Sequence, residues 1–503
     1  MPARSGPTQV GEGSDIGGQP LYLEPRTDGP LRSLLDCGTL LHTLTDALGS
    51  PLNVVLPDRV ADNLARFRTV YAGHHLSGQV HFAHKANRSS ALLRRLAATD
   101  AGVDVASLGE LQHALGAGFT PDRITATGPK DPDFLWLAAR TSVTVVVDGR
   151  GELDRLARLV RAHALPRVRI MPRLSGFETR GVRVLSRPSR FGTPVPEVGS
   201  LLDAVEHHAD TLDLTGVAYH LDTTGLAEKA TALEGCLTVL EECRGRGLRP
   251  TAVDIGGGFG VDYLADGGQW ERYTSELTAA VLGTRPPLTR DGHGYGLRNE
   301  SGTLRGSLGL YPAHRPVAGP RYLDELLAQP APAFDGRPLA SLLLEHLYDL
   351  HVEPGRALLD QCGLTLTRVV EAEAQEAGGE LLVRLAATGH DVALEEHGVL
   401  MDPVLVPRHP ERDDEGPVAV RLVGGLCLES DLITRRTVFL PRRPRPGDLL
   451  AFVNTAGYCM DFHATHAQRR PVARKVAAWQ QGGAWRWCLD DRYWPTASVG
   501  GAQ

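Results

Sequence analysis

Lys85 is the residue of this sequence best placed to carry out chemistry. It lies in the heptapeptide HFAHKAN, residues 81–87, at the end of a short apolar run and before a helix-like segment, residues 88–96. A lysine ammonium is strongly hydrated and costly to bury. A lysine fixed at the end of a core strand therefore either extends outward to water or is held neutral as a Schiff-base amine. The heptapeptide by itself leaves both interpretations open.

A second group of residues could bind an anion. Gly256, Gly257 and Gly258 follow the apolar run 251–255, and consecutive glycines let backbone N–H groups approach an anion closely. A tight turn from strand to loop is the plain alternative. Arg356 offers a guanidinium fork and Tyr458 a hydroxyl, and both can satisfy phosphate oxygens. These two side chains favour the phosphate interpretation.

Taken in order, the motifs resemble those of the fold-type III pyridoxal phosphate decarboxylases, the family of diaminopimelate, ornithine and arginine decarboxylases. In that family a Tyr/Phe-Ala-x-Lys-Ala-Asn lysine carries the cofactor, and residues 82–87 are similar to that motif. Further matching motifs stand at residues 189–192, 220–225, 254–259, 353–356, 427–431 and 456–458. The resemblance covers about residues 40–475.

The resemblance implies a role for each catalytic residue. Lys85 would hold pyridoxal 5'-phosphate as an internal aldimine and be displaced by the substrate amine, which gives an external aldimine. Glu353 would pair with the pyridine nitrogen and keep the ring a strong electron sink, while His220 lies flat on the ring. Cys427, reaching the site from the neighbouring subunit, would protonate the quinonoid that remains after carbon dioxide leaves.

The resemblance also implies two sets of binding residues. Those expected to hold the cofactor are Lys85, His220, Thr223, Gly256, Gly257, Gly258, Glu353, Arg356 and Tyr458. Those expected to contact the substrate are Arg190, Asp402, Glu429 and Asp431.

Three positions depart from the family's pattern. Asp222 replaces a glycine, Met401 an aromatic residue, and Leu428 the acidic residue that normally follows the cysteine. Because that acidic residue meets the distal amine of the substrate in several members, Leu428 argues against plain ornithine or meso-diaminopimelate as the substrate.

The composition indicates a cytoplasmic enzyme. The 503 residues can bury a large core, and a formal charge of −7 without a basic stripe argues against nucleic-acid binding. No apolar run is long enough to span a bilayer, and no signal sequence is apparent. Seven scattered cysteines fit a reducing compartment. We expect no metal site, because the histidine clusters 207–208 and 463–466 are explained by solvated helix faces.

The chain divides into four expected parts. Residues 1–30, rich in Gly, Ser and Pro, are expected to be disordered, and residues 31–50 to join the β domain. Residues 51–350 alternate between strand and helix patterns, which indicates a parallel sheet, closed as an (α/β)₈ TIM-type barrel of the alanine racemase kind if the resemblance holds.

Residues 351–503 make up the fourth part. Short alternating stretches after residue 371 indicate an antiparallel β domain.

Within the barrel region, residues 283–338 exceed what a barrel connection needs. This segment is either a floppy insertion, an ordered excursion far from the chemistry, or a lid or subunit contact beside the active site. Since long loops at the carboxyl ends of barrel strands lie beside the active site, we favour the last of these.

The sequence therefore predicts a homodimeric decarboxylase that acts on the α-carboxylate of an amino acid or amino-acid conjugate, with active sites shared between the two chains. Two alternatives use the same scaffold. One is a pyridoxal phosphate-dependent racemase or epimerase, against which the Cys427 motif argues. The other is a catalytically silent regulator, which the departures at Asp222, Met401 and Leu428 would suit.

Overall fold

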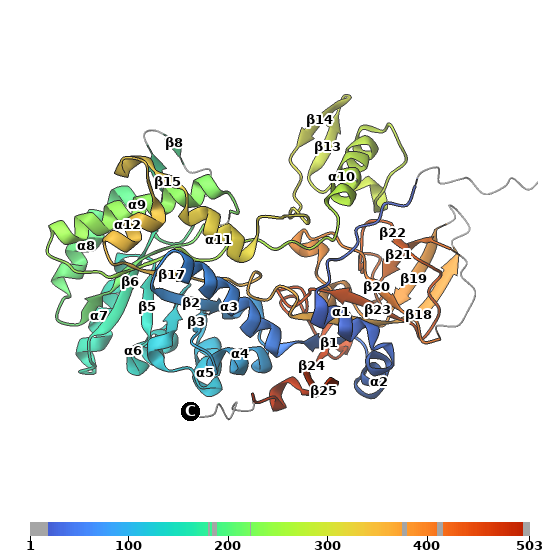
Figure 1. Ribbon diagram of the computed structural model, residues 1–503, viewed down its shortest axis with the longest axis horizontal. Coiled ribbons are helices and arrows are strands. Elements are labelled where there is room, and N and C mark those ends of the chain that lie inside the picture. The colour runs from blue at the N-terminus through green and yellow to red at the C-terminus, as the bar shows by residue number, and fades with distance from the viewer. Residues whose placement is uncertain are drawn as a thin grey trace, which may run out of the picture.

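Two lobes make up the protein, a helix-covered barrel and a β domain, which lie side by side in Figure 1. The computed structural model describes residues 19–179, 182–183, 189–221, 223–374, 380–409 and 416–495. The expected combination of an (α/β)₈ barrel with a separate, mainly antiparallel sheet is confirmed.

The barrel is closed, because β17 pairs with β2 and β5 pairs with β6. Every residue of β3 is buried, as expected of a parallel strand that is covered on both sides. In order around the barrel, the parallel strands are β2 (Gly78–Ala83), β3 (Gly102–Val105), β4 (Ile124–Ala126), β5 (Thr144–Val147), β6 (Val168–Ser175), β11 (Gly216–Tyr219), β12 (Ala252–Asp254) and β17 (Asp349–Val352).

Helices cover the outside of the barrel. The side chains of Ser89, Ser107 and Asp131 each accept a hydrogen bond from a backbone N–H in the first turn, which fixes where α4, α5 and α6 begin. The helices of this layer are α3 (Pro57–Gly73), α4 (Ser90–Ala97), α5 (Leu108–Ala117), α6 (Pro132–Thr141), α7 (Arg150–Ala162), α8 (Val198–His207), α9 (Leu226–Gly245), α11 (Gly319–Leu327) and α12 (Leu339–Glu345).

The β domain contains one strand that we expected in the barrel. β1 (Leu52–Val55) pairs with β18 and β24, so the expected start of the barrel at residue 51 is wrong. All four residues of β1 are buried, and a helix follows them, which in sequence looks the same as a barrel strand. The other strands of this lobe are β18 (Gly363–Ala374), β19 (Leu381–Leu385), β20 (Val404–Val406), β21 (Val418–Val423), β22 (Val438–Leu440), β23 (Leu449–Val453), β24 (Arg474–Gln481) and β25 (Ala484–Leu489).

The segment 283–338 is ordered and has two different parts. Its first part forms the hairpin of β13 (Leu297–Glu300) and β14 (Thr303–Gly306), which packs on α10 (Gly267–Leu282) and projects from the body in Figure 1. Its second part, from α11 onward, packs on α3 and α9 and belongs to the barrel layer. The expected insertion therefore ends near residue 318. Helix α11 begins with a Gly-Pro pair, which in the sequence was taken as part of the loop.

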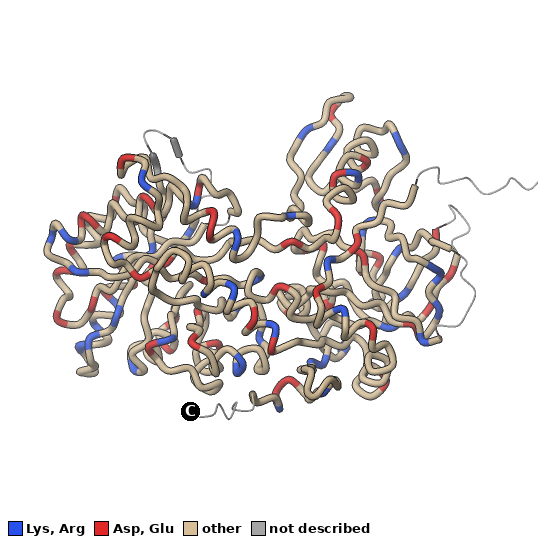
Figure 2. The backbone as a smooth tube through the Cα atoms, viewed as in Figure 1, with Lys and Arg blue, Asp and Glu red and all other residues tan. Residues whose placement is uncertain are grey.

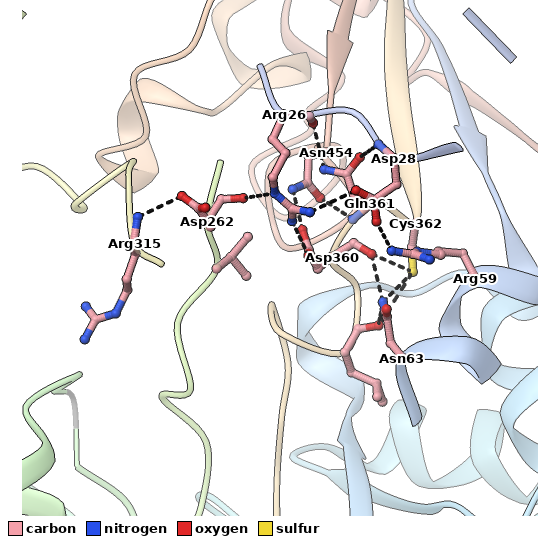
Figure 3. A network of polar contacts seen from close by, with 12 residues as sticks. Arg26, Asp28, Arg59, Asn63, Asp262, Arg315, Asp360, Gln361, Cys362 and Asn454 are labelled. Carbon is pink, nitrogen blue, oxygen red and sulfur yellow. Dashed lines mark hydrogen bonds and ion pairs between the residues drawn. The ribbon is translucent and has the colours of Figure 1, made fainter. Parts of the chain in front are cut away.

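The N-terminal segment is held between the lobes, so the expectation of a disordered tail is wrong for residues 19–30; residues 1–18 lie outside the described part of the chain. Figure 3 shows the contacts that hold it. Arg26 donates to the backbone carbonyl of Asp262 (2.9 Å) and pairs with Asp360, while Asp28 pairs with Arg59 of α3. After this segment, α1 (Gly29–Asp36) and α2 (Gly38–Leu48) lead into β1.

These contacts also hold the loop that leaves β17. Asn454 donates to the Asp360 carboxylate (2.8 Å), and the Gln361 side chain accepts from the backbone N–H of Asp28 (3.0 Å). The segment between Glu353 and Gln361 is therefore anchored to both lobes.

Acidic and basic residues are interspersed over both lobes, as Figure 2 shows. None of the described helices combines the length and the apolar character needed to cross a membrane.

Candidate active site

A polar cluster lies at the carboxyl ends of the barrel strands. Lys85 follows β2 in the turn η1 (His84–Ala86), His220 follows β11, and Glu353 follows β17. Because all strands of a parallel barrel end at the same mouth, these three side chains meet. His220 Nδ1 lies 3.9 Å from Glu353 Oε2. The charge of Glu353 raises the pKa of Lys85, and the charge of Lys85 lowers the pKa of His220.

Two further carboxyl groups join this cluster, and sequence reasoning missed both. Asp104, the last residue but one of β3, accepts a hydrogen bond from the Thr127 hydroxyl (2.7 Å), while Asp254 ends β12 and accepts one from the Gly256 N–H (2.8 Å). Each keeps a buried oxygen with no hydrogen-bond partner among the described residues. An acidic residue inside the otherwise apolar run 102–105 was the available signal for Asp104.

Burial sets the protonation of the carboxyl groups. It raises the pKa of Asp254 to about 7, and together with the charges of Asp104 and Asp254 it raises the pKa of Glu353 well above its usual value. The barrel mouth therefore disfavours the charged form of Glu353 unless a cation lies beside it.

Lys85 is surrounded by these groups. Burial opposes its charged form, but the charges of Asp104, Tyr458 and Glu353 outweigh that penalty and raise the pKa of Lys85. The Tyr458 N–H donates to the carbonyl of Ala86 (2.8 Å), which ties the lysine turn to the β domain. The side chain therefore lies within the mouth of the barrel, and the interpretation that it extends outward to water does not hold.

The glycine triplet packs directly against the cluster. Gly256 and Gly258 have φ values of 63° and 89°, a region that favours glycine. A Cβ atom at Gly256 would lie 2.7 Å from His220 Nδ1, and one at Gly257 would lie 2.8 Å from the carbonyl of Glu353. Only glycines leave this concave stretch of backbone open for a ligand.

Lys229 lies behind the triplet, and sequence reasoning missed it too. It is fully buried in α9, and its ammonium donates to the carbonyls of Ile255 (3.3 Å) and Gly257. Burial lowers the pKa of Lys229 to about 8, although Glu353 and Asp254 favour its charged form. In the sequence, Lys229 lies on the same helical stripe as Leu233 and Leu237, which was the available signal.

Arg356 presents an unused donor to the same mouth. Its guanidinium lies over the rings of Tyr311 (4.9 Å) and Tyr458 (5.4 Å), and its buried Nη1 has no hydrogen-bond partner among the described residues. A phosphate oxygen is the kind of acceptor that such a donor lacks. The Thr223 hydroxyl, in the turn before α9, accepts from the Gly225 N–H (2.9 Å).

The part of the insertion that follows the hairpin contacts the loops at this mouth. The Tyr311 hydroxyl accepts a hydrogen bond from the Val261 N–H (2.8 Å), just after the glycine loop. The Arg315 guanidinium donates to the hydroxyl and the carbonyl of Thr224 (2.6 and 2.7 Å). Tyr311 and Arg315, which the sequence analysis did not single out, therefore connect both predicted cofactor loops.

Cys427 lies elsewhere in the same chain. It is exposed and lines a cavity of about 640 Å³ in the β domain, which Arg290 of the insertion also lines. Among the described residues, no hydrogen bond, ion pair or ring contact joins it to the Lys85 cluster. Asp431 holds its loop by accepting from the N–H groups of Gly389 (2.8 Å) and Leu426 (2.7 Å), and the exposed Glu429 pairs with Arg290 (3.3 Å).

Asp402, which was expected to contact the substrate, is instead paired within the protein. One of its oxygens pairs with the fully buried Arg436 (2.6 Å), and the other accepts from the Leu23 N–H (2.7 Å), so neither is free for a substrate. A buried arginine requires such a counter-ion. Its neighbour Met401 is buried in the core.

The remaining predicted positions lie at the surface or outside the described residues. Arg190 is exposed and stacks on Phe191 (4.6 Å), whose ring also meets Arg173 of β6. Leu428 is 57% exposed, and Asp222 lies outside the described residues.

Known proteins share both the barrel and the site motifs. Residues 58–302 match the family model described as "Pyridoxal-dependent decarboxylase, pyridoxal binding domain". An uncharacterized protein, y4yA of Sinorhizobium fredii, is 30% identical over 442 residues, 86% of this chain and 89% of that protein. The diaminopimelate decarboxylase of Methanothermobacter thermautotrophicus is 25% identical over 85% of this chain and 87% of its own length.

Solved structures share the whole architecture. The crystal structure of diaminopimelate decarboxylase from M. jannaschii has a TM-score of 0.67 at 18% identity and covers 89% of this chain and 91% of that chain. This likeness shows the fold, a closed barrel joined to a mainly antiparallel β domain. The chain belongs to the pyridoxal-dependent decarboxylase family, and that family binds pyridoxal phosphate.

The residues present fit this cofactor. The glycine backbone, where no side chain fits, and the unpartnered Arg356 Nη1 suit a phosphate, and the buried Glu353, whose pKa is raised, suits a basic ring nitrogen.

The buried Lys229 leads to a test of the pH dependence of stability. Because its pKa is about 8 in the folded protein and 10.5 when unperturbed, the unfolded chain binds more protons between these values. Wild-type stability should therefore rise relative to Lys229→Met, by about 2 kcal/mol, as the pH increases from about 8 to about 10.5. Urea unfolding of both proteins without added cofactor measures the difference, which below pH 8 should be constant. If the free energies of unfolding of the two proteins change in parallel across pH 8–10.5, the pKa of Lys229 is not lowered in the folded protein.

Proposed function

We propose that the protein removes the α-carboxylate of an amino acid or amino-acid conjugate. The observation that carries the proposal is the meeting of Lys85, Glu353 and Arg356 at one barrel mouth. The charge of Glu353 acts on Lys85, and Arg356 keeps a buried donor without a partner among the described residues. When bound, pyridoxal phosphate supplies a ring that accepts the negative charge left as carbon dioxide departs.

The protein's own residues bind and orient. Lys85 offers the amine that holds the cofactor's aldehyde. Glu353, whose pKa is raised by burial and by the neighbouring carboxyl groups, would pair with the ring nitrogen and share a proton with it. His220 is neutral, because burial lowers its pKa well below the usual value, so its imidazole can pack against an aromatic face without bringing a charge. The glycine amides, Thr223, Arg356 and Tyr458 would hold the phosphate.

The distal end of the substrate is where this chain differs from its relatives. Leu428 stands where the family resemblance gives an acidic residue, and arginines at positions 290, 421 and 435 line the cavity beside Cys427. We infer a substrate other than ornithine or meso-diaminopimelate. The described cysteines are all free, which supports a reducing, cytoplasmic setting.

A panel of amino acids and simple conjugates tests the reaction. Incubation with enzyme and pyridoxal phosphate, followed by mass spectrometry, should reveal one substrate that loses about 44 mass units, the mass of carbon dioxide. Lys85→Ala should abolish this product, because the variant lacks the amine that would hold the cofactor's aldehyde.

A control is Arg321→Ala, which removes an exposed cation of α11 that pairs with Glu325 on the same helix. Racemised but undiminished substrate would support the epimerase alternative. A wild-type protein that binds the cofactor but converts nothing in the panel would instead support the regulator.

We further propose that each active site is shared between two chains. Within one chain, no described contact joins Cys427 to the Lys85 cluster. The cavity beside Cys427 is lined by residues of the β domain and of the insertion, which lie beside the barrel lobe in Figure 1. A two-fold contact that brings each cavity to the partner's barrel would complete both sites at once.

Mixing two inactive variants tests this arrangement. Lys85→Ala and Cys427→Ala chains, co-refolded in equal amounts, should form heterodimers with one intact site, which gives about a quarter of wild-type activity under random pairing. Each variant refolded alone serves as the control. If the mixture stays inactive while size measurement confirms subunit exchange, Lys85 and Cys427 act within one chain and the proposal of shared sites is wrong.

A further inference from the structure

Three ligand-type side chains meet in the interior of the barrel. His81 lies on β2, His351 on β17 and Asp254 on β12, and these three strands are neighbours in the barrel. One nitrogen of each histidine and one carboxylate oxygen all lie within 4.8 Å of one another. The imidazole rings of His81 and His351 are 5.1 Å apart, edge to face.

The three groups point at one another without being satisfied. Nδ1 of His81, Nδ1 of His351 and Oδ2 of Asp254 are buried and have no hydrogen-bond partner among the described residues. The remaining atoms of two of these side chains are used: Asp254 Oδ1 accepts from the Gly256 N–H (2.8 Å), and His81 Nε2 lies 3.3 Å from the Thr125 hydroxyl. Buried polar atoms in proteins nearly always have a partner, so three together indicate a missing bound species.

The barrel makes room for this cluster. Gly102 of β3 stands opposite His81 in the strand register, and a Cβ atom there would lie 2.2 Å from the His81 ring. Any side chain at position 102 would therefore displace the imidazole from the interior.

The spacing along the strands places the cluster beneath the cofactor residues. His81 precedes Lys85 by four residues, and Asp254 and His351 precede Gly256 and Glu353 by two. Lys85, Gly256 and Glu353 follow the ends of β2, β12 and β17, so the three groups lie on the strands, just before the turns that carry the predicted cofactor residues.

We propose that His81, Asp254 and His351 bind a divalent transition-metal ion, with zinc as the representative, in the core of the barrel. Two imidazoles and one carboxylate are a ligand set that zinc accepts. Around tetrahedral zinc such ligand atoms lie about 3.4 Å apart, so small side-chain rotations would close the cluster on an ion. Burial lowers the pKa of His351 to about 4 and that of His81 well below its usual value, so both rings are already neutral, as a ligand must be.

The ion would have a structural consequence. Asp254 would bind it through Oδ2 while Oδ1 holds the first amide of the glycine triplet, so the metal would fix the start of that loop. Of the three residues, only Asp254 also belongs to the charge cluster around Glu353, and metal binding can be measured without any activity.

Metal content of the full chain tests the proposal without any activity measurement. The protein is unfolded in chelator, refolded with zinc, passed through a desalting column and analysed for bound metal. Wild type should retain about one zinc per chain, whereas His351→Gln and His81→Gln should each retain less than about a fifth of that amount, since losing one of three ligands removes most of the affinity. The matched control is His207→Gln. His207 and His208 are consecutive residues at the end of α8, and this variant should retain the wild-type amount of zinc.

A cobalt-loaded wild type provides a second readout that does not require the variants to fold. Bound Co²⁺ in a nitrogen and oxygen site of low symmetry should give visible absorption bands that titrate to one equivalent and disappear when zinc is added. Wild type that retains no zinc and shows no such bands would overturn the proposal and assign the cluster to a bound water or a shared proton. Equal zinc retention in wild type, His351→Gln and His81→Gln would overturn it as well, because the ion would then lie elsewhere.

Discussion

The structure depends on the burial of several ionisable groups in one closed space. Lys85, Glu353, Asp104 and Asp254 share the interior of a barrel that excludes most water, so each charge is strongly affected by the others. Desolvation alone would neutralise all four. The carboxyl groups do shift that way, whereas the lysine is kept charged because the surrounding acids outweigh its own desolvation. The chemistry available at the barrel mouth follows from that imbalance.

The rest of the fold keeps these groups in place. The loop after Glu353 is anchored by Asp360 and Gln361 to the N-terminal segment, as Figure 3 shows, and the turn that carries Lys85 is held by the backbone of Tyr458. Both lobes and the chain's N-terminal region therefore help to hold Lys85 and Glu353, which follow barrel strands. Domain boundaries drawn through the sequence do not reveal this dependence, because the contacts join residues more than 300 positions apart.

The sequence predicted the features that are local. The lysine turn, the glycine triplet and the arginine after β17 are short motifs whose chemistry depends on neighbouring residues, and the structure brings them together. Features that depend on distant partners were missed or wrong. β1 was expected in the barrel because the sequence of a strand buried on both faces looks the same in either sheet. Asp402 was expected to contact the substrate because no residue near it in the sequence indicates its ion pair with Arg436. Lys229 was overlooked because a single lysine on the apolar face of a helix is recognised only when the sequence is arranged by helical periodicity.

The central claim is that Lys85 is the amine that binds the cofactor. Lys229 is its natural rival, because it is buried beside the same glycine loop and its pKa of about 8 makes it a good nucleophile. Borohydride reduction of the protein loaded with pyridoxal phosphate, followed by peptide mapping, decides between them. The pyridoxyl group should be found on the peptide that contains Lys85 and nowhere else in the map. A pyridoxyl group on Lys229 would contradict the assignment of the site.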